Sequence, residues 1–487
     1  MLFNSIEFLI FFPIVLIIYY IVPAKLKNLW LLLASYYFYM SWNAKYAILI
    51  LISTVITYLS GLFLEKVSRK KLVVALSFIS NLGILFYFKY TNFALYTLQG
   101  ALSKINIELN VPTFDILLPV GISFYTFQAL SYTMDVYRGE IYAEKNFLRY
   151  ALFVSFFPQL VAGPIERSKN LLKQLAVPQP FSPKRFQEGF LLMLWGYFLK
   201  LVLADRIALF VDSVYREYDT HPGWYIVLAS VLFAFQIYCD FAGYSTIAMG
   251  AAWILGIKLM ENFNAPYLNT TVASFWRDWH ISLTTWFKDY LYIPLGGSRK
   301  GKLRKYINEM IVFLVSGLWH GASISFVIWG GLNGLYQVIG EFLNPIRKKI
   351  SNFLNINKAS AGYKFVSAFI TFILVDFAWI FFRAQSAPVA FGVIKQMFSI
   401  NNIWVLFDGS LYECGLDMKN FKLMLAALLI LLAADVAKKK GIVIRDIIIR
   451  QDAWFRYLFI PVSIALILIF GKYGPAYDSA AFIYFQF

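Results

Sequence analysis

The residues from Phe275 to Gly334 read FWRDWHISLTTWFKDYLYIPLGGSRKGKLRKYINEMIVFLVSGLWHGASISFVIWGGLNG. This stretch holds two of the three histidines of the 487-residue chain, His280 and His320. His280 lies in an aromatic and charged segment, whereas His320 lies far enough along an apolar segment to be at membrane depth. A titratable imidazole is costly in hydrocarbon surroundings, so His320 is a candidate for a functional site.

The composition of the chain is that of a membrane protein. Hydrophobic residues make up 60% of it and charged residues 15%, against about one quarter charged in a typical soluble domain. The net charge is +17, but Lys and Arg occur in short clusters between apolar spans, as in cytoplasmic loops, so nucleic-acid binding is not expected. The first apolar stretch has neither a basic segment before it nor a small-residue cleavage site, which indicates a retained transmembrane helix rather than a signal peptide.

Apolar segments with about the length that crosses a bilayer recur along the whole chain. They lie roughly at residues 5–22, 44–64, 72–93, 114–136, 189–211, 224–243, 306–322, 324–343, 365–382, 421–437 and 454–471, with short pieces at 29–42 and 245–257. Alternate loops are basic, which places both termini outside the cytoplasm. We therefore predict an all-α polytopic integral membrane protein of the cell membrane, with about 10–11 transmembrane helices.

Two further segments are predicted to enter or lie on the membrane without crossing it. Residues 147–163 have basic loops on both sides, which fits a re-entrant segment and equally a proline-kinked helix on the surface. Residues 270–300 read as an amphipathic, interfacial helix.

Several function classes lack their sequence signatures. The chain has no internal repeat, Walker loop, dinucleotide-binding fingerprint or Gly-x-Ser-x-Gly elbow. Its histidines lack i, i+4 spacing, and its two cysteines, Cys239 and Cys414, stand alone. We therefore expect neither a metal site nor a disulfide framework.

The predicted helix that carries His320 offers two interpretations. Ser316, His320 and Ser323 would share one face, and Gly317 and Gly321 would let a neighbouring helix approach closely. The imidazole could be a packing residue that hydrogen-bonds across a helix pair. It could also be a buried, neutral general base that acts on a hydroxyl.

The interfacial segment around His280 also has two interpretations. On one continuous helix, Arg277, His280, Thr284 and Lys288 would form a polar stripe beside Trp276. Basic and aromatic residues together are typical of a membrane-surface anchor. The same stripe could instead form a polar wall that holds an anionic or thioester-bearing donor.

A third polar feature crosses an apolar span. Gln236, Asp240 and Tyr244 are spaced by four residues, so they share one helix face. An intramembrane Asp is usually paired or lines a water-filled path. Asp240 could thus serve the site or be the structural partner of a neighbouring Arg.

The chain resembles the membrane-bound O-acyltransferase (MBOAT) family, and within it the bacterial alginate O-acetyltransferase (AlgI-like) branch. The stretches that carry the resemblance are LPVGISFYTFQALSYTMDVYRG, FFPQLVAGPIER, FQIYCDFAGYSTIAMGAAWILG, FWRDWHISLTTWFKDYLYIPLGG, SGLWHGASISFVIWGGLNG and the tail FIYFQF. They run from about residue 114 to the C-terminus, and the N-terminal helices fit as well.

The resemblance implies a helical fold around a central tunnel. One membrane domain would span residues 1–487, with N-terminal helices at 1–113, a catalytic core at 114–343 and C-terminal helices at 344–487. The histidine of the family's WHG motif corresponds to His320, and the second polar position of the family's site falls on His280. Further candidates for the donor side and the tunnel lining are Trp319, Ser316, Ser323, Asp240, Gln236, Tyr244, Arg277, Trp276, Thr284 and Asn333.

The resemblance also implies an activity. Enzymes of this branch move an acyl group, usually acetyl, toward an exported polysaccharide such as alginate or a cell-wall polymer. The donor would be acetyl-CoA on the cytoplasmic side, with no tightly bound cofactor, and an extracytoplasmic partner of the SGNH-hydrolase type would complete the transfer. D-Alanyl transfer to teichoic acid and a conduit without catalysis are the alternatives.

Overall fold

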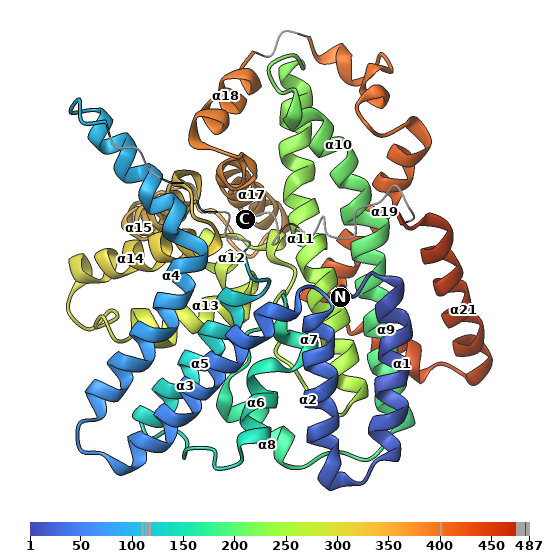
Figure 1. Cartoon of the computed structure of the whole chain (residues 1–487). Coiled ribbons are helices and arrows are strands. Elements are labelled where there is room, and N and C mark those ends of the chain that lie inside the picture. The colour runs from blue at the N-terminus through green and yellow to red at the C-terminus, as the bar shows by residue number, and fades with distance from the viewer. Residues whose placement is uncertain (109–111, 113, 115–117, 400–401, 474–482, 484–487) are drawn as a thin grey trace. The chain divides into compact units, whose positions relative to one another are not determined.

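The computed structural model describes residues 1–108, 112, 114, 118–399, 402–473 and 483. Within these residues the regular structure is helical, apart from one isolated antiparallel bridge between Phe263 and Trp279 (Figure 1). The predicted all-α class is therefore confirmed. The tail at 481–487, apart from Ile483, and the first residues of the predicted span 114–136 lie largely outside the described residues.

The helices have the following bounds in chain order. They are α1 (Ile6–Ile21), α2 (Ala24–Met40), α3 (Ala47–Lys66), α4 (Lys70–Ser103), α5 (Ile122–Tyr137), α6 (Phe147–Ser155), α7 (Phe157–Leu160), α8 (Ser168–Ala176), α9 (Pro183–Tyr197), α10 (Asp205–Arg216), α11 (Gly223–Ile254), α12 (Val272–Asp278), α13 (Ile281–Phe287), α14 (Lys302–His320), α15 (Ile324–Phe342), α16 (Asn344–Phe353), α17 (Ala361–Arg383), α18 (Ala387–Met397), α19 (Met418–Lys439), α20 (Ile444–Arg450) and α21 (Ala453–Phe470).

Six helical segments of the described chain are long and apolar enough to cross a membrane. They are Ala44–Lys66, Lys70–Ser103, Gly223–Ile254, Ala361–Arg383, Met418–Lys439 and Ala453–Phe470. The other crossings predicted from the sequence fall on shorter or less apolar helices. Many large apolar side chains, such as Tyr457 and Ile469 on α21, are exposed on the protein surface, as lipid-facing side chains are.

The chain divides into two compact units. The first comprises Met1–Phe190 with Ala248–Met260, and its helices α3 and α5 pack through small residues. A Cβ on Gly61 of α3 would lie 2.5 Å from the Tyr132 hydroxyl oxygen, so only glycine allows this approach. Thr57 of α3 accepts a hydrogen bond of 2.7 Å from the Tyr150 hydroxyl.

The predicted segment 147–163 lies inside the first unit. It forms the short helices α6 and α7, and every residue from Tyr150 to Ser168 is buried. This burial argues against a helix on the surface. Irregular backbone at membrane depth is tolerated where protein covers it, which fits the re-entrant interpretation.

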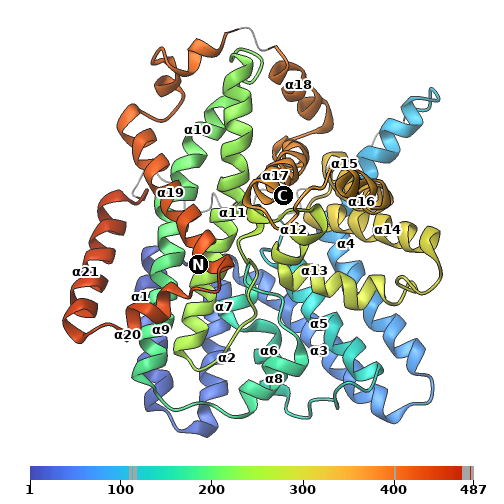
Figure 2. The same ribbon diagram turned by 180° about the vertical axis from the view of Figure 1, so that it is seen from behind.

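The second unit comprises Leu191–Ile247 with residues from Glu261 onward, and a helical hairpin of α14 and α15 lies within it. The two helices lie side by side in both views (Figures 1 and 2). A Cβ on Gly317 would lie 2.2 Å from the Phe326 carbonyl oxygen, and one on Gly330 would lie 2.3 Å from the Phe313 carbonyl oxygen. The predicted close approach of a neighbouring helix at Gly317 is confirmed.

The apolar segments predicted separately at 224–243 and 245–257 form the single helix α11. Gly243, at the predicted break, lies inside the helix, where a Cβ would come within 2.9 Å of the Gly196 carbonyl oxygen. The glycine serves close helix packing and does not end the helix. α11 ends at Ile254, and Gly256 adopts a φ of +86° that suits a helix C-terminus.

The prediction of one interfacial helix over 270–300 is wrong. α12 ends at Asp278, His280 has a φ of 44°, and the chain restarts as α13 and then a π-helical turn, Lys288–Tyr292. The break separates Arg277 from Thr284, so the predicted polar stripe does not form. Arg277 is exposed, and the Thr284 hydroxyl donates to the Trp279 carbonyl at 3.2 Å.

Candidate functional site

His280 and His320 lie close together within the second unit. Their ring centroids are 6.3 Å apart, although 39 residues separate them in the chain. His280 comes from the junction of α12 and α13, and His320 is the last residue of α14. Only 1% of His280 and 6% of His320 is exposed. The structure thus brings together the two residues that the sequence placed in the catalytic role.

The backbone of His280 is held by a loop residue, Asn262. His280 adopts a left-handed conformation, which is uncommon for a residue other than glycine and is found at functional sites. The Asn262 carbonyl accepts the Ile281 N–H at 3.0 Å, and its Oδ1 accepts the Ser282 hydroxyl at 2.7 Å. Its Nδ2 donates to the Ser245 hydroxyl of α11 at 3.0 Å. Asn262 therefore ties the His280 turn to α11.

Aromatic rings enclose the two imidazoles. The His280 ring lies 4.6 Å from Phe241 between centroids, and the His320 ring lies 5.1 Å from Trp329 and 5.3 Å from Phe382. His280 lies outside the six candidate spans, and burial lowers its pKa to about 3. Its ring is therefore neutral at physiological pH, with one nitrogen able to donate and the other able to accept.

Further hydrogen bonds and ring contacts hold the aromatic rings around His320 in place. Trp276 of α12 donates its Nε1–H to Oδ1 of Asn333 on α15 at 3.2 Å. Asn333 in turn donates to the Trp329 carbonyl at 2.9 Å, and the Trp329 ring contacts His320. Trp319 precedes His320, and its ring lies 4.9 Å from it. Trp319 therefore contacts His320 directly, whereas Trp276 and Asn333 are linked to it through Trp329.

Asp240 is ion-paired with a buried lysine. Lys200 Nζ lies 2.6 Å from Asp240 and 2.9 Å from Asp205, and all three side chains are almost fully buried. The adjacent Phe241 contacts His280. The structural-partner interpretation of Asp240 is the one that the contacts favour, with a lysine in place of the expected arginine.

The remaining candidates are dispersed. Gln236 and Tyr244 are buried on α11, on the helix face that they share with Asp240. Ser316 is buried on α14. Ser323 lies beyond the end of α14, where its hydroxyl accepts the Ser325 N–H at 3.3 Å and caps α15. The predicted helical face of Ser316, His320 and Ser323 therefore does not exist.

Sequence reasoning missed Asn262, Phe241, Trp329, Phe382 and Lys200. Asn262 lies in the Asn- and Pro-rich stretch ENFNAPYLNTT, which reads as an ordinary loop. The aromatic residues lie in apolar segments where nothing local distinguishes them from lipid-facing side chains. The π-helical turn Phe198–Ala204, which carries Lys200, has no simple sequence signature. In the described part of the chain, no three His, Cys, Asp or Glu residues gather as metal ligands.

Comparison with known proteins gives a consistent result. Residues 9–381 match the model of the MBOAT, membrane-bound O-acyltransferase family. The chain is 37% identical to the probable alginate O-acetylase AlgI of Azotobacter vinelandii, over 84% of this chain and 80% of that protein. It is 35% identical to the peptidoglycan O-acetyltransferase of Helicobacter pylori over 83% and 81%. It is 27% identical to the teichoic acid D-alanyltransferase of Bacillus subtilis over 49% and 62%.

Proposed function

Because the chain belongs to the membrane-bound O-acyltransferase family, we propose that this membrane O-acyltransferase acetylates hydroxyls of an exported polysaccharide or cell-wall polymer. The donor in this proposal is a cytoplasmic thioester, acetyl-CoA, and no tightly bound cofactor is needed. The names of two relatives support the acetyl group, since one is an alginate O-acetylase and the other a peptidoglycan O-acetyltransferase. The D-alanyltransferase relative is less similar and matches only half of the chain.

The convergence of His280 and His320 is the observation that carries the proposal. Acyl transfer needs a base for the attacking hydroxyl and a donor of hydrogen bonds for the developing oxyanion. His320 takes the proton of the acceptor hydroxyl, whose oxygen then attacks the acetyl carbonyl. The carbon–sulfur bond breaks as the ester forms, and the proton passes from His320 to the thiolate. His280, with its neutral ring, orients the donor or stabilises the oxyanion.

The proposal includes a direction across the membrane. Arg277, Lys288, Arg299 and Lys300 are exposed, so their charges can attract an anionic donor from the cytoplasm. The acceptor approaches from the opposite face of the cell membrane, on which both termini lie. In this proposal a separate extracytoplasmic acetyltransferase of the SGNH type supplies the hydroxyl that His320 activates and then passes the acetyl group to the polymer.

The histidine roles are tested with three single variants of the full chain. His320→Ala removes the base, and His280→Asn removes the ring while keeping a residue type that tolerates the left-handed backbone. His221→Ala alters the third histidine, which lies elsewhere on the chain, and serves as the matched control. The measurements are CoA release from acetyl-CoA in proteoliposomes and ester-linked acetyl groups in the cell-envelope polymers of expressing cells.

We expect His320→Ala to lose about 100-fold or more of the rate, since general base catalysis contributes that much. His280→Asn should lose about tenfold, and His221→Ala should match the unaltered protein. The elution volume of each purified variant is first compared with that of the unaltered protein, to establish that the variant is folded. A folded His320→Ala variant with near-normal activity would remove His320 from the chemistry.

A further inference from the structure

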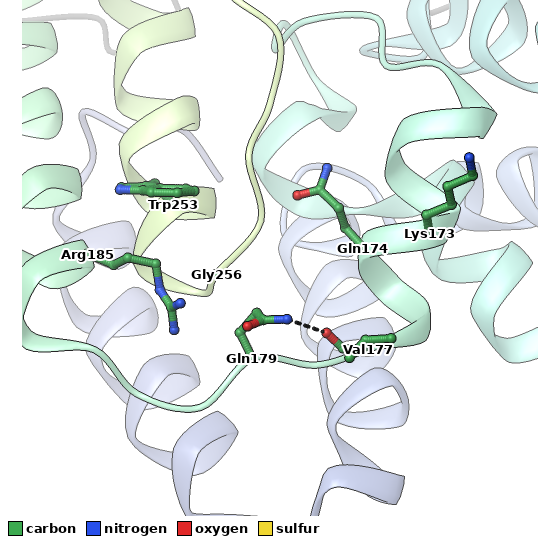
Figure 3. Close-up of a pocket in the computed structure, with 7 residues that line it drawn as sticks. All are labelled: Lys173, Gln174, Val177, Gln179, Arg185, Trp253 and Gly256. Carbon is green, nitrogen blue, oxygen red and sulfur yellow. Dashed lines mark hydrogen bonds between the residues drawn. The ribbon is translucent and has the colours of Figure 1, made fainter.

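A cavity of about 360 Å³ opens in the first unit, at the C-terminal ends of α8 and α11. Figure 3 shows Arg185 and Trp253 on one side of it and Gln174 and Lys173 on the other. Its lining includes Lys173, Gln174, Gln179, Arg185, Trp253 and Gly256. The volume is at the lower end of the range for small-molecule sites.

The charge around this cavity is positive. Lys173 and Arg185 line it, and no carboxylate does. Lys27 adds a third positive charge, since its Nζ donates to the Gln179 carbonyl at 3.3 Å. In the described parts of the chain, none of these three cations forms an ion pair with a carboxylate. Glu188, one turn after Arg185, instead accepts the Trp253 Nε1–H at 2.7 Å.

Arg185 is incompletely hydrogen-bonded. Its Nη2 donates to the Pro180 carbonyl, but its buried Nε–H has no acceptor among the described residues. A buried donor without an acceptor costs free energy, and an anion in the cavity would remove that cost. Guanidinium groups bind phosphate through two parallel hydrogen bonds, and Lys173, on the opposite side of the cavity, adds a point charge.

The walls of the cavity are held in place by contacts of their own. The Gln174 amide donates to the Lys258 carbonyl at 3.0 Å and accepts the Lys258 N–H at 2.7 Å. Gly256 has a positive φ, and a Cβ there would lie 2.7 Å from the Gln179 Cβ. A larger residue would push the loop that carries Gln179 away from the end of α11. The cavity is therefore largely formed before a ligand enters.

The lining residues lie at the ends of apolar segments. Trp253 and Gly256 lie at the C-terminal end of the candidate span Gly223–Ile254. Lys27 follows the apolar helix α1, and its Nζ lies 4.6 Å from the Tyr19 ring centroid. Trp, Tyr and Lys at the ends of membrane helices lie at the depth of the lipid headgroups, and the basic loops place this end on the cytoplasmic side. Basic pockets between helices at that depth bind anionic headgroups.

We propose that this cavity binds the phosphate group of a phosphate ester, with Arg185 and Lys173 as its ligands and the Trp253 ring as an apolar wall. At headgroup depth the abundant source of such a group is an anionic phospholipid, and a soluble nucleotide is the other source. The proposal is independent of the proposed acetyl transfer, since it assigns no step of the reaction to the cavity.

The test uses the purified full-length chain and native mass spectrometry. The protein is titrated with phosphatidylglycerol, with phosphatidylcholine as the neutral-headgroup comparison. The variant is Lys173→Gln/Arg185→Gln, and the matched control is Lys358→Gln/Lys364→Gln, which removes two exposed charges in another part of the chain. We expect the unaltered protein and the control to bind phosphatidylglycerol at least tenfold more tightly than the cavity variant does.

A second arm identifies the source of the phosphate and keeps the test valid if the variant misfolds. Adenosine 3′,5′-bisphosphate is added as a soluble competitor, and its displacement of the lipid would assign the site to a soluble phosphate ester. Lys173→Arg/Arg185→Lys keeps both charges and should retain the binding. If phosphatidylglycerol and the bisphosphate both bind equally to all of these proteins, or bind to none, the cavity is not a phosphate site.

Discussion

Asn262 fixes the turn that presents His280, and its side chain reaches both Ser282 and Ser245. Asn262→Ala removes these hydrogen bonds while the backbone bond to Ile281 can remain. We expect about tenfold slower acetyl transfer, because poorer positioning of His280 should raise the activation free energy by about 1.4 kcal/mol. The rates are compared at equal concentrations of folded protein. The measurement is the CoA release assay at saturating acetyl-CoA.

The variant Asn262→Asp distinguishes a loss of His280 positioning from a general loss of folded protein. An aspartate keeps the acceptor for Ser282 but cannot donate to Ser245, so its rate should fall between those of the alanine variant and the unaltered protein. Asn357→Ala, which removes an exposed loop cap, is the control for loss of an Asn side chain. Equal rates for Asn262→Ala and the unaltered protein would mean that the His280 turn needs no such support.

Glu166 makes the stability of the first unit depend on pH. Burial raises the pKa of the Glu166 carboxyl to about 7, although the Met260 N–H and the Arg167 charge both act to lower it. The folded chain therefore holds a proton between about pH 4.5 and 7 that the unfolded chain releases. Stability conferred by the protonated form is complete below about pH 4.5 and is lost as the pH rises through 7, by on the order of 3 kcal/mol.

Glu166→Gln should abolish this part of the pH dependence, because the amide does not titrate and its oxygen can still accept the Met260 N–H. The apparent melting temperature in detergent, measured from pH 4.5 to 8, should fall less steeply for the variant. Glu217→Gln changes an exposed carboxylate and should leave the profile unaltered. Parallel profiles for Glu166→Gln and the unaltered chain would show that this carboxyl does not titrate over the range.

At the level of elements, the α14–α15 hairpin depends on the absence of a side chain at Gly317. A Cβ there would lie 2.2 Å from the Phe326 carbonyl oxygen, and neither backbone can move without shifting the other helix. Gly317→Ala should therefore destabilise the protein by about 1–3 kcal/mol, as overpacking does. Since His320 ends α14, acetyl transfer should fall with it.

Gly331→Ala is the matched control on the same hairpin. A Cβ at Gly331 would meet only Leu314 Cδ2, at an ordinary contact distance of 3.7 Å. Alanine also favours the helix more than glycine does, so this variant should be as stable as the unaltered protein or slightly more so. Similar melting temperatures for Gly317→Ala and Gly331→Ala would contradict the close packing at Gly317.

The hairpin also shows how much of the fold was predictable from the sequence. Long apolar segments and the spacing of small residues predicted the close helix approach at Gly317 that the α14–α15 pair shows. The same evidence failed at Gly243, because a glycine that ends a helix and one that admits a neighbour look alike in sequence. It also failed at His280, where the helix breaks and the next residues, Ile281 and Ser282, hydrogen-bond to Asn262, which lies outside the segment 270–300.

From the sequence, only those site residues could be predicted whose type is unusual in their own segment. His280 and His320 could be named because imidazoles are rare in this chain, and the family resemblance paired them. Asp240 was read as a candidate for the site because a carboxylate in an apolar span is unusual. Only the fold shows that Lys200 reaches it from the π-helical turn before α10.

For the whole molecule, the sequence makes a topological prediction that membrane labelling can check. α17, one of the candidate spans, separates two loops of different charge. Residues 344–360, before it, carry Arg347, Lys348, Lys349 and Lys358, whereas the segment after it has no excess of positive charge. The positive-inside rule then places Lys348 in the cytoplasm and Phe407 outside.

Single cysteines at these two exposed positions should therefore react differently with a maleimide that cannot cross membranes. Phe407→Cys should be labelled in intact cells, and Lys348→Cys only after the cells are permeabilised. The native Cys239 and Cys414 are buried, which keeps background labelling low, and the unaltered chain measures it. Labelling of Lys348→Cys but not Phe407→Cys in intact cells would mean that the topology is the reverse of the predicted one. The exposed basic residues proposed to attract acetyl-CoA belong to the same topological scheme, so the direction of transfer would then have to be reversed as well.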